Sequence, residues 1–397
     1  MDERLALQAA TDHVFIAGMG DLGEALCRAN VAFGLAKIHS LQRRLGRTPN
    51  ACFVGAPDAT ITRNPRRWRK GFGYGGSYSV DDDLAILDSK PNACGMLVGA
   101  LDSPPDEATI REAASALREH PPALDGVQLT YDLDESNHFA DVCELEERLV
   151  DDPALVTPDH LFVIHSSGHE HRQESPLGPG LYIDESPELQ AMSERHDTPW
   201  GSLSFLVGEP ARAYYRFCSA VQDFNARRRA LFGEQLFGTF HPLCNATHQG
   251  FRRPGLHYLG AYGFEDPTQI YPLTLGPDQP VYLLRPKKNF SPKMIDDLAW
   301  TQRARSLGLL PRLLDANILP HGGGYALRGH LLRIEGQTDD DRRFLIDPGA
   351  REEAPPFALQ NIREIPYAYR GNEVLHRTQT LHLAEPVARY RVRFVVK

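Results

Sequence analysis

Two stretches of the sequence each place a histidine among residues that suit a metal ligand or a catalytic base. His138 lies in DLDESNHFAD at residues 132–141, and His165 lies in LFVIHSSG at residues 161–168. Each histidine is predicted to follow directly on an extended, partly apolar run, and polar or small residues come after it. A histidine at the end of a strand points into the cleft that the neighbouring loops enclose. Two such strand ends, together with a cysteine and a further histidine, would make a metal site.

A cysteine and a third histidine are candidates for the remaining ligands. Cys94 lies in a glycine-containing turn between two apolar runs within residues 84–101, where its thiol could face a cleft or pack inertly in the core. His248 lies in a polar loop, FHPLCNATHQG at residues 240–250, which taken alone is typical of the surface. Both residues become candidate ligands only if the two strand-end histidines converge on them.

A fourth histidine precedes three glycines. His321 lies in LPHGGGYALR at residues 319–328. Glycines let a backbone approach a bulky ligand closely and donate N–H groups to phosphate oxygens. A histidine beside such a loop can accept a phosphoryl or nucleotidyl group. The alternative is a glycine-rich turn with a histidine that has no chemical role.

The composition indicates an ordinary globular protein in which these groups would be positioned. The chain has 397 residues, 42% of them hydrophobic, which is enough for a full core and for two or three domains. Its six cysteines are scattered without a CxxC pair, which predicts reduced thiols and a cytoplasmic location. No apolar run is long enough to span a membrane, and the start is too polar for a signal peptide. The net charge of −9 argues against coating nucleic acid through bulk electrostatics, although a local basic groove stays open.

The N-terminal part, residues 1–48, is expected to be mainly helical, with an amphipathic helix from Glu24 to Leu45. The GxGxxG at residues 18–23 precedes this helix, and we interpret it as a tight strand-to-helix turn. A dinucleotide site would need a second strand ending in an acidic residue about 20 residues later, and a long helix continues there instead. A buried strand is then expected over residues 51–58.

Further along the chain the pattern predicts two helices and an insertion. A surface helix is expected over residues 104–120, and a long helix over residues 209–237 with Arg227 to Arg229 on its solvated face. Residues 169–199 are rich in Glu, Pro, His and Gly and are interpreted as a loop or lid insertion with solvated histidines at 169 and 171. The terminal run at residues 388–397 is expected to be a strand.

Basic and aromatic residues alternate in RNPRRWRKGFGYGG at residues 63–76. Such a loop suits contacts with a phosphate backbone and stacking on bases. A solvated surface loop explains the same residues equally well. Arg252 and Arg253 are further candidates for backbone contacts.

The order of these short motifs resembles the RtcB family of RNA-splicing ligases. The motifs are CGM at 94–96, NHF at 137–139, HSSG at 165–168, THQ at 247–249, HGGG at 321–324, PYAY at 366–369 and VVK at 395–397. Each motif is short, so the resemblance depends on the ordered set, which runs from about residue 51 to the end. It implies one mixed α/β (α+β) catalytic domain over residues 1–397, with central β-sheets flanked by helices and a metal site in the cleft.

The resemblance implies a role for each matching residue. Metal ligands would be Cys94, His138, His165 and His248, holding one or two manganese ions, with zinc as the alternative metal. His321 would be the nucleophile that carries GMP. Contacts to the guanine nucleotide would come from Asn137, Asp141, Tyr369 and Lys397.

The implied activity is joining RNA ends that carry a 3′-phosphate or 2′,3′-cyclic phosphate to 5′-hydroxyl ends, with GTP as cofactor. The partners would be RNA ends, for example of tRNA or damaged RNA, GTP and an accessory activator, and no membrane. The alternatives are a metal-dependent end-processing phosphoesterase that does not ligate, and a catalytically silent RNA-binding relative.

The sequence departs from the family pattern at several positions. Pro91 stands where the family has a metal-binding aspartate, and Asp88 is the nearest carboxylate that could replace it. The family's nucleotide loop is replaced by RPKKN at residues 285–289, and its Arg-Lys-Gly-Ala segment by YLGA at residues 258–261. Tyr325 stands where an arginine is expected after the glycines. The metal-binding residues are therefore better kept than the guanylate pocket.

Overall fold

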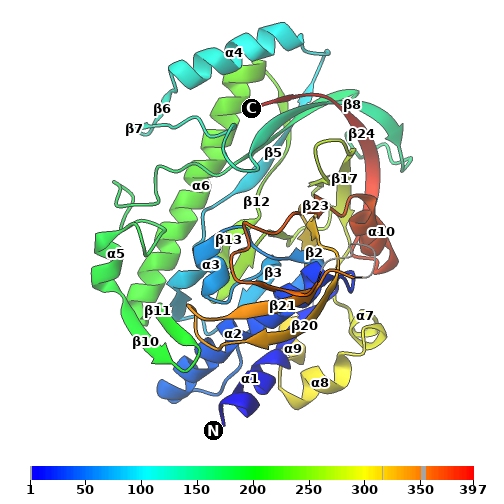
Figure 1. Cartoon of the computed structure of the whole chain (residues 1–397). Coiled ribbons are helices and arrows are strands. Elements are labelled where there is room, and N and C mark those ends of the chain that lie inside the picture. Colours follow the sequence, from blue (N-terminus) through cyan, green and yellow to red (C-terminus); the bar gives the residue numbers. More distant parts are fainter. Residues whose placement is uncertain (1, 315, 350–354) are drawn as a thin grey trace.

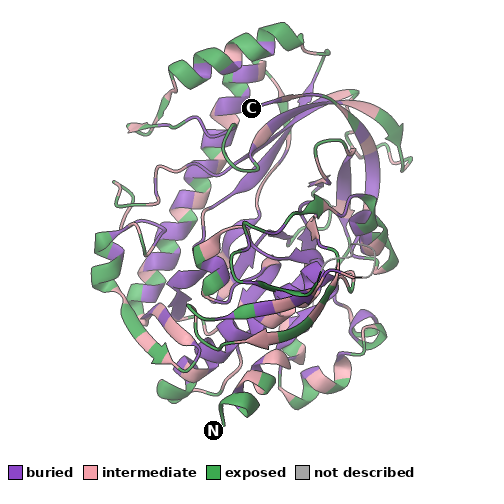
Figure 2. Cartoon of the chain, viewed as in Figure 1, coloured by how far each residue is buried: buried purple, intermediate pink, exposed green. Residues whose placement is uncertain are grey.

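The computed structural model describes residues 2–314, 316–349 and 355–397, which form a mixed α+β arrangement of several sheets and helices (Figure 1). The two largest sheets have seven and five strands. Buried residues concentrate in these sheets and in the helices that pack on them, whereas peripheral helices such as α4 (Glu107–Glu119) are exposed on their outer faces (Figure 2). The expected mixture of strands and helices is therefore confirmed.

The seven-stranded sheet is antiparallel throughout. Its order is β12 (His241–Thr247), β5 (Gly95–Leu101), β9 (His160–Ser166), β8 (Phe139–Arg148), β24 (Ala384–Val396), β17 (Val281–Pro286) and β16 (Tyr271–Thr274). All seven residues of β5 are buried. A Cβ at Gly99 would lie 2.3 Å from the Phe162 ring, so this glycine lets β9 pack its phenylalanine against β5. The C-terminal strand, β24, lies inside this order, between β8 and β17.

The five-stranded sheet carries the N-terminal part of the chain. Its order is β1 (Val14–Ile16), β2 (Cys52–Thr60), β3 (Tyr74–Ser79), β14 (Leu256–Leu259) and β13 (Gln249–Arg253). The β1–β2 pair is parallel, and all nine residues of β2 are buried, as is usual for a strand covered on both faces. The GxGxxG residues form the predicted turn between β1 and α2 (Leu22–Arg44).

Helix α2 begins at Asp21, whose side chain accepts a hydrogen bond from the Glu24 amide at 2.9 Å. Its burial differs from the amphipathic pattern that we expected, because 17 of its 23 residues are buried, including Lys37 and His39. The reason is that α2 packs on β1 and β2 and is also covered by α1 (Glu3–Thr11) and β20 (His330–Glu335).

The long helix α6 (Glu209–Phe237) begins after Gly208 and ends at Gly238, both with positive φ. It packs across β5, β9 and β12 on one side and against β4 (Leu84–Ile86) and β11 (Gly201–Val207) on another (Figure 1). The expected solvated arginine face is wrong for two of its three residues. Arg227 is exposed, but Arg228 and Arg229 are fully buried because α6 lies between two packed layers.

Smaller sheets and helices complete the described structure. The small sheets are β10 (Glu194–Thr198) with β11 and β4; β20 with β21 (Arg343–Asp347) and β22 (Phe357–Leu359); β6 (Ala123–Leu124) with β7 (Val127–Gln128); β15 (Ala261–Gly263) with β18 (Ile318–Pro320); and β19 (Tyr325–Ala326) with β23 (Ala368–Tyr369). The short helices are α3 (Pro65–Arg69), the 3₁₀ turn η1 (Leu87–Ser89), α5 (Pro187–Met192), α7 (Pro292–Asp297), α8 (Thr301–Ser306), α9 (Leu310–Leu313) and α10 (Asn372–Thr380).

Two segments that we interpreted as loops are more regular than expected. The 169–199 insertion contains α5 and the strand β10, which pairs with β11. The basic stretch after residue 63 includes helix α3, in which Arg67 and Trp68 are buried. The Arg67 guanidinium donates hydrogen bonds to the carbonyls of Ser89 and Lys90, so this arginine has a structural role.

Within residues 2–314, 316–349 and 355–397, none of the helices combines the length and the apolar content needed to cross a membrane.

Candidate metal centre and adjoining cavity

Four ligand-bearing segments meet at one end of the seven-stranded sheet. Cys94 directly precedes β5, His165 is the second-last residue of β9, and His138 directly precedes β8. The strand register aligns them, because Met96 and Phe139 both pair with His165 across the β5–β9 and β8–β9 ladders. His248 follows β12, whose last residue, Thr247, pairs with Gly95 next to Cys94. Sequence-distant residues are thereby brought to the same sheet end.

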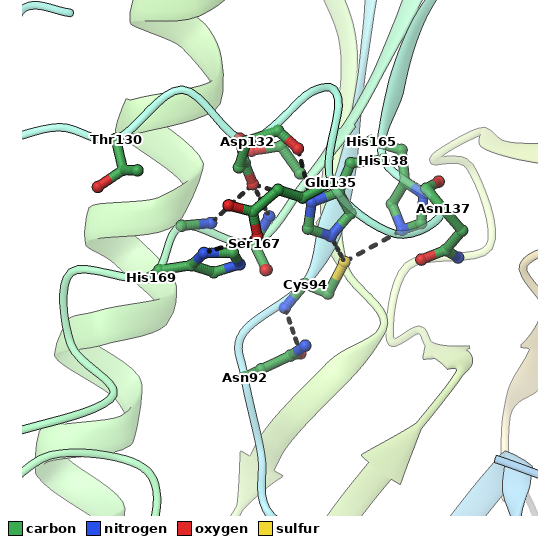
Figure 3. Close-up of polar contacts among 12 residues, drawn as sticks. Asn92, Cys94, Thr130, Asp132, Glu135, Asn137, His138, His165, Ser167 and His169 are labelled. Atoms are coloured by element: carbon green, nitrogen blue, oxygen red, sulfur yellow. Dashed lines mark hydrogen bonds and ion pairs between the residues drawn. The ribbon is translucent and has the colours of Figure 1, made fainter. Parts of the chain in front are cut away.

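The side chains of the three histidines gather around Cys94. The Cys94 Sγ lies 3.0 Å from the His165 Nε2 and 3.6 Å from the His138 Nε2 (Figure 3). The His165 Nε2 lies 3.3 Å from the His248 Nε2. Ligand atoms around one tetrahedral ion with bonds of about 2.0–2.3 Å are about 3.3–3.6 Å apart. The spacing of Cys94, His165 and His248 therefore fits a divalent metal ion, and His138 belongs to a second candidate group with Asp132 and His169.

The buried cysteine and histidines shift one another's pKa values in a way that favours a bound cation. Burial alone would raise the pKa of the Cys94 thiol, but the surrounding imidazoles of His165, His248 and His138 hold that pKa well below its usual range. Burial also opposes the charge on His138, yet the Cys94 thiolate and Asp132 raise the pKa of His138 to about 10. These shifts favour a Cys94 thiolate beside a protonated His138. A metal ion bound to the thiolate would take over the role of counter-charge.

Asp132 contacts the ring nitrogen of His138 that does not face Cys94. Its carboxylate forms an ion pair with the His138 Nδ1 at 3.0 Å, and its backbone carbonyl oxygen lies 3.2 Å from the same nitrogen, which leaves the Nε2 directed at Cys94 (Figure 3). The same carboxylate accepts from the backbone amides of Ser167 and Gly168 and pairs with Arg228 at 3.0 Å. Both oxygens are therefore committed to protein donors. We interpret Asp132 as the outer partner that orients a metal-binding histidine, an arrangement that tunes ligand basicity in metalloproteins.

The other two histidines of the cluster differ in their outer contacts. The His165 Nδ1 lies 2.9 Å from the Asn137 carbonyl oxygen, so the backbone fixes that ring. The His248 Nδ1 is buried and has no hydrogen-bond partner among the described residues. Burial and the neighbouring His321 lower the pKa of His248 to about 3, which keeps its imidazole neutral as a metal ligand requires.

His321 lies directly beside the metal cluster. Its ring centroid is 4.4 Å from that of His248. The buried carboxylate of Asp58, in β2, accepts from the His321 Nδ1 at 2.9 Å and from the His321 backbone amide at 3.2 Å. A carboxylate can only accept, so Nδ1 carries the proton and Nε2 keeps its lone pair. The arrangement is that of a histidine oriented for nucleophilic attack through Nε2.

A cavity of about 410 Å³ opens beside His321. It is lined by every residue that the resemblance assigns to the nucleotide, and by one candidate metal ligand: Asn137, Asp141, His165, His321, Tyr369 and Lys397. These residues come from segments as distant as residues 137 and 397. Burial, partly offset by Lys397, raises the pKa of the Asp141 carboxyl to about 7. The volume and the mixture of aromatic and polar lining are those of a small-molecule site.

The glycines after His321 are explained by close packing of the chain. A Cβ at Gly323 would lie 2.2 Å from the Leu275 carbonyl oxygen, and one at Gly324 would lie 2.5 Å from the Asp58 carbonyl oxygen. Gly324 also has a φ of +59°. These glycines let the loop lie against β2, which brings His321 within reach of Asp58.

Asp88 does not join the cluster. Its carboxylate accepts from the Ser204 amide at 2.6 Å and lines a separate pocket together with Lys70 and Lys90. The structure therefore gives no support to Asp88 as a replacement for the family's aspartate. It lies in η1, which precedes Cys94 in the sequence and contacts β11.

Several functional residues were missed or misjudged from the sequence. Asp58 and Asp132 had no assigned role, although an aspartate in a fully buried strand is a signal that could have found the first. His138 precedes a strand, whereas we expected it to follow one. His171 is buried against Phe224, and the largely buried His169 pairs with Glu135, so neither fits the solvated environment expected of them.

Comparison of the chain with models of known protein families finds no match, and comparison with curated proteins finds none either.

Proposed function

We propose that this protein is a divergent member of the RtcB family that uses GTP and a divalent metal ion to join RNA ends. The substrates would be an RNA 3′-phosphate or 2′,3′-cyclic phosphate end and a 5′-hydroxyl end. One observation carries the proposal. A single cavity gathers His321 and the four nucleotide contacts expected from the resemblance, and it adjoins the Cys94–His165–His248 cluster.

The reactive step on the protein would be formation of a histidine–GMP adduct. The Nε2 lone pair of His321 forms a bond to the α-phosphorus of GTP, the bond to the bridging oxygen breaks, and pyrophosphate leaves with that electron pair. The ring becomes an imidazolium, and Asp58, 2.9 Å from the Nδ1, stabilises the charge that develops. Asp141 would accept hydrogen bonds from the guanine base, and Lys397 would contact the nucleotide at the same end of the cavity.

A bound divalent ion would neutralise charge on the transferred phosphoryl group. The Cys94 thiolate and the imidazoles of His165 and His248 would hold it, with His138 next to Cys94. This set has no carboxylate, since Pro91 replaces the family's aspartate and Asp88 faces elsewhere. Such a set suits a borderline-soft ion, and Mn²⁺ stands at the weak end of the Irving–Williams order. Zn²⁺ is therefore expected to bind this site more tightly than Mn²⁺. Asp132, His138 and His169 form the place where a second ion would bind.

The RNA end would approach from the other side of the metal cluster. A second cavity, of about 300 Å³, is lined by Cys94 and His138 and by four arginines. Arg67 is committed to the carbonyls of Ser89 and Lys90, which leaves Arg63, Arg172 and Arg363 for phosphate. Arginine is the side chain best suited to bidentate contact with phosphate. The metal cluster adjoins both cavities, through His165 in the first and through Cys94 and His138 in the second, which supports the proposal.

Ligation of a defined RNA pair tests the proposal. One RNA carries a 2′,3′-cyclic phosphate or a 3′-phosphate, the other a 5′-hydroxyl, and the protein is supplied with GTP and either Mn²⁺ or Zn²⁺. Joined product is expected with GTP and metal, and its loss is expected in a His321→Ala variant. Ligation by the His321→Ala variant, or ligation independent of GTP, would contradict the proposal.

One observation favours a second function, metal-dependent processing of RNA phosphate ends without ligation. Among the described residues that line the nucleotide cavity, the cations are Arg111 and Lys397, which is few for a triphosphate. Arg285 of the altered nucleotide loop instead pairs with Asp152 and Glu385. Opening of a cyclic phosphate in the same assay, without joined product and without a GTP requirement, would identify this function.

A further inference from the structure

Three side chains on one face of helix α6 contact the segments that carry all four candidate metal ligands. They are Asn225, Arg228 and Arg229, which we call the α6 polar face. Their spacing of i, i+3 and i+4 places them together on the helix surface. Their exposed fractions are 3%, 0% and 0%, although amide and guanidinium groups are rarely buried so completely. Such groups persist in a core only where they are used for hydrogen bonding.

Arg228 links two of the ligand-bearing segments. Its Nη1 donates to the Asp132 carboxylate at 3.0 Å and to the Ser166 hydroxyl at 2.6 Å. Asp132 in turn orients His138, and Ser166 is the residue after His165. The guanidinium also donates to the Thr130 carbonyl and to Glu170, so every side of its fork is occupied by the protein.

Asn225 and Arg229 reach the other two segments. The Asn225 amide donates to the carbonyls of Ser167 and of Ala93, the residue before Cys94. The Arg229 Nε donates at 2.8 Å to the side chain of Asn245, on the strand that ends at His248, and its Nη1 lies 3.4 Å from the Ser166 carbonyl oxygen.

Each candidate ligand is thus connected to α6 through a different intermediate. The intermediates are the backbone next to Cys94, Asp132 for His138, Ser166 for His165 and Asn245 for His248. Because one rigid helix holds all four segments, the ligand atoms keep their spacing when the ion is absent. Outer contacts of this kind orient ligands and typically contribute 10–100-fold to metal affinity.

We propose that the α6 polar face is the device that positions the metal ligands, so that Asn225, Arg228 and Arg229 are positioning residues for the metal centre. This inference rests on the metal centre of the proposed function. It does not depend on GTP, on RNA or on ligation.

The chain contains a matched control for the test. Arg227 neighbours Arg228 in the sequence, but its side chain is 52% exposed and pairs with the half-exposed Asp125 on the surface. An arginine-to-lysine change keeps the charge and removes the planar fork of donors. Arg228→Lys and Arg229→Lys therefore test the α6 polar face, and Arg227→Lys makes the same chemical change on the same helix outside it.

Titration of each full-length protein with Co²⁺ provides the measurement. Co²⁺ reports its ligands through the visible absorption of the ion and the near-ultraviolet band of a thiolate ligand. We expect Arg228→Lys and Arg229→Lys to weaken Co²⁺ binding by about 10–100-fold. We also expect them to alter the visible spectrum at saturation, whereas Arg227→Lys leaves both unchanged. A purely structural role would lower the unfolding temperature without changing the spectrum of the bound ion.

Asn225→Leu serves as a second variant if the arginine variants do not fold. It is similar in size and removes only the donors to Ala93 and Ser167, and weaker Co²⁺ binding with an altered spectrum is expected. Folded variants with wild-type affinity and spectrum would overturn the inference while leaving the metal centre intact. If the Cys94→Ala variant has the same Co²⁺ spectrum as the wild-type protein, the metal centre itself is overturned.

Discussion

The contact between Asp58 and His321 allows the proposed chemistry to be tested with a minimal change. Asp58→Asn keeps an oxygen acceptor in place for the His321 Nδ1, which lies 2.9 Å from the carboxylate, and removes only the negative charge. The pair is buried, so solvent screens it little. A carboxylate and an imidazolium with charge centres about 4 Å apart attract each other by about 4 kcal/mol at an effective dielectric constant of about 20. Loss of that stabilisation as the ring becomes charged would slow formation of the histidine–GMP adduct by about a thousandfold.

The assay is a single-turnover reaction with GTP labelled at the α-phosphate, stopped at intervals and analysed for an acid-labile, alkali-stable protein adduct. The Asp58→Asn protein must bind Co²⁺ as the wild type does, so that a slower rate reflects the chemistry on His321. His321→Ala provides the blank. Wild-type rates of labelling in Asp58→Asn would refute the assigned role of Asp58.

Three further predictions concern the metal, the cavity and the glycine loop. Cys94→Ala should weaken Co²⁺ binding beyond the 10–100-fold typical of an outer-shell change, measured by calorimetric titration; unchanged affinity would exclude Cys94 as a ligand. Burial raises the pKa of Asp141 to about 7, so the folded state holds a proton that the unfolded state has lost above its pKa of about 4, and stability falls as the pH rises from about 4 to 7. Urea unfolding should therefore show Asp141→Asn gaining roughly 2–3 kcal/mol over wild type between pH 5 and pH 8, and an equal difference at both pH values would contradict the assignment. Gly323→Ala should lower stability by about 1–3 kcal/mol because its Cβ would meet the Leu275 carbonyl, whereas Gly322→Ala, with its nearest atom at 3.1 Å, should lower it less; equal melting temperatures would count against this packing.

The candidate residues are visible in the sequence as local motifs, but their gathering at one site was predicted from the resemblance in the order of those motifs. Histidines at the ends of apolar runs, a cysteine in a turn between strands and a histidine before three glycines are all visible in short windows. Once these runs form adjacent strands of one sheet, their ends must meet, as the pairing of both Met96 and Phe139 with His165 illustrates. Strand pairing in the seven-stranded sheet explains the convergence of Cys94, His138, His165 and His248, whereas His321 follows β18 of another sheet and is brought in by packing.

The supporting residues could not be predicted because their roles depend on packing between distant elements. Arg228 and Arg229 lie in a run of three arginines that has the pattern of a solvated face, and burial of α6 between two layers reverses that interpretation. The contact of Asp58 with His321 joins residues 263 positions apart. Asp88 is near Cys94 in sequence, but the η1 turn directs its side chain to Ser204. Tertiary structure decided each of these cases.

The central claim is that His321, beside a cysteine–histidine metal centre, accepts a nucleotide. Mass spectrometry of peptides from the full-length protein, after incubation with GTP and Mn²⁺ or Zn²⁺ and digestion at alkaline pH, tests it most directly. We predict a GMP adduct on His321 that forms only with metal and is absent from Cys94→Ala. Metal-loaded wild-type protein that carries no adduct, or carries it on a different residue, would contradict the claim.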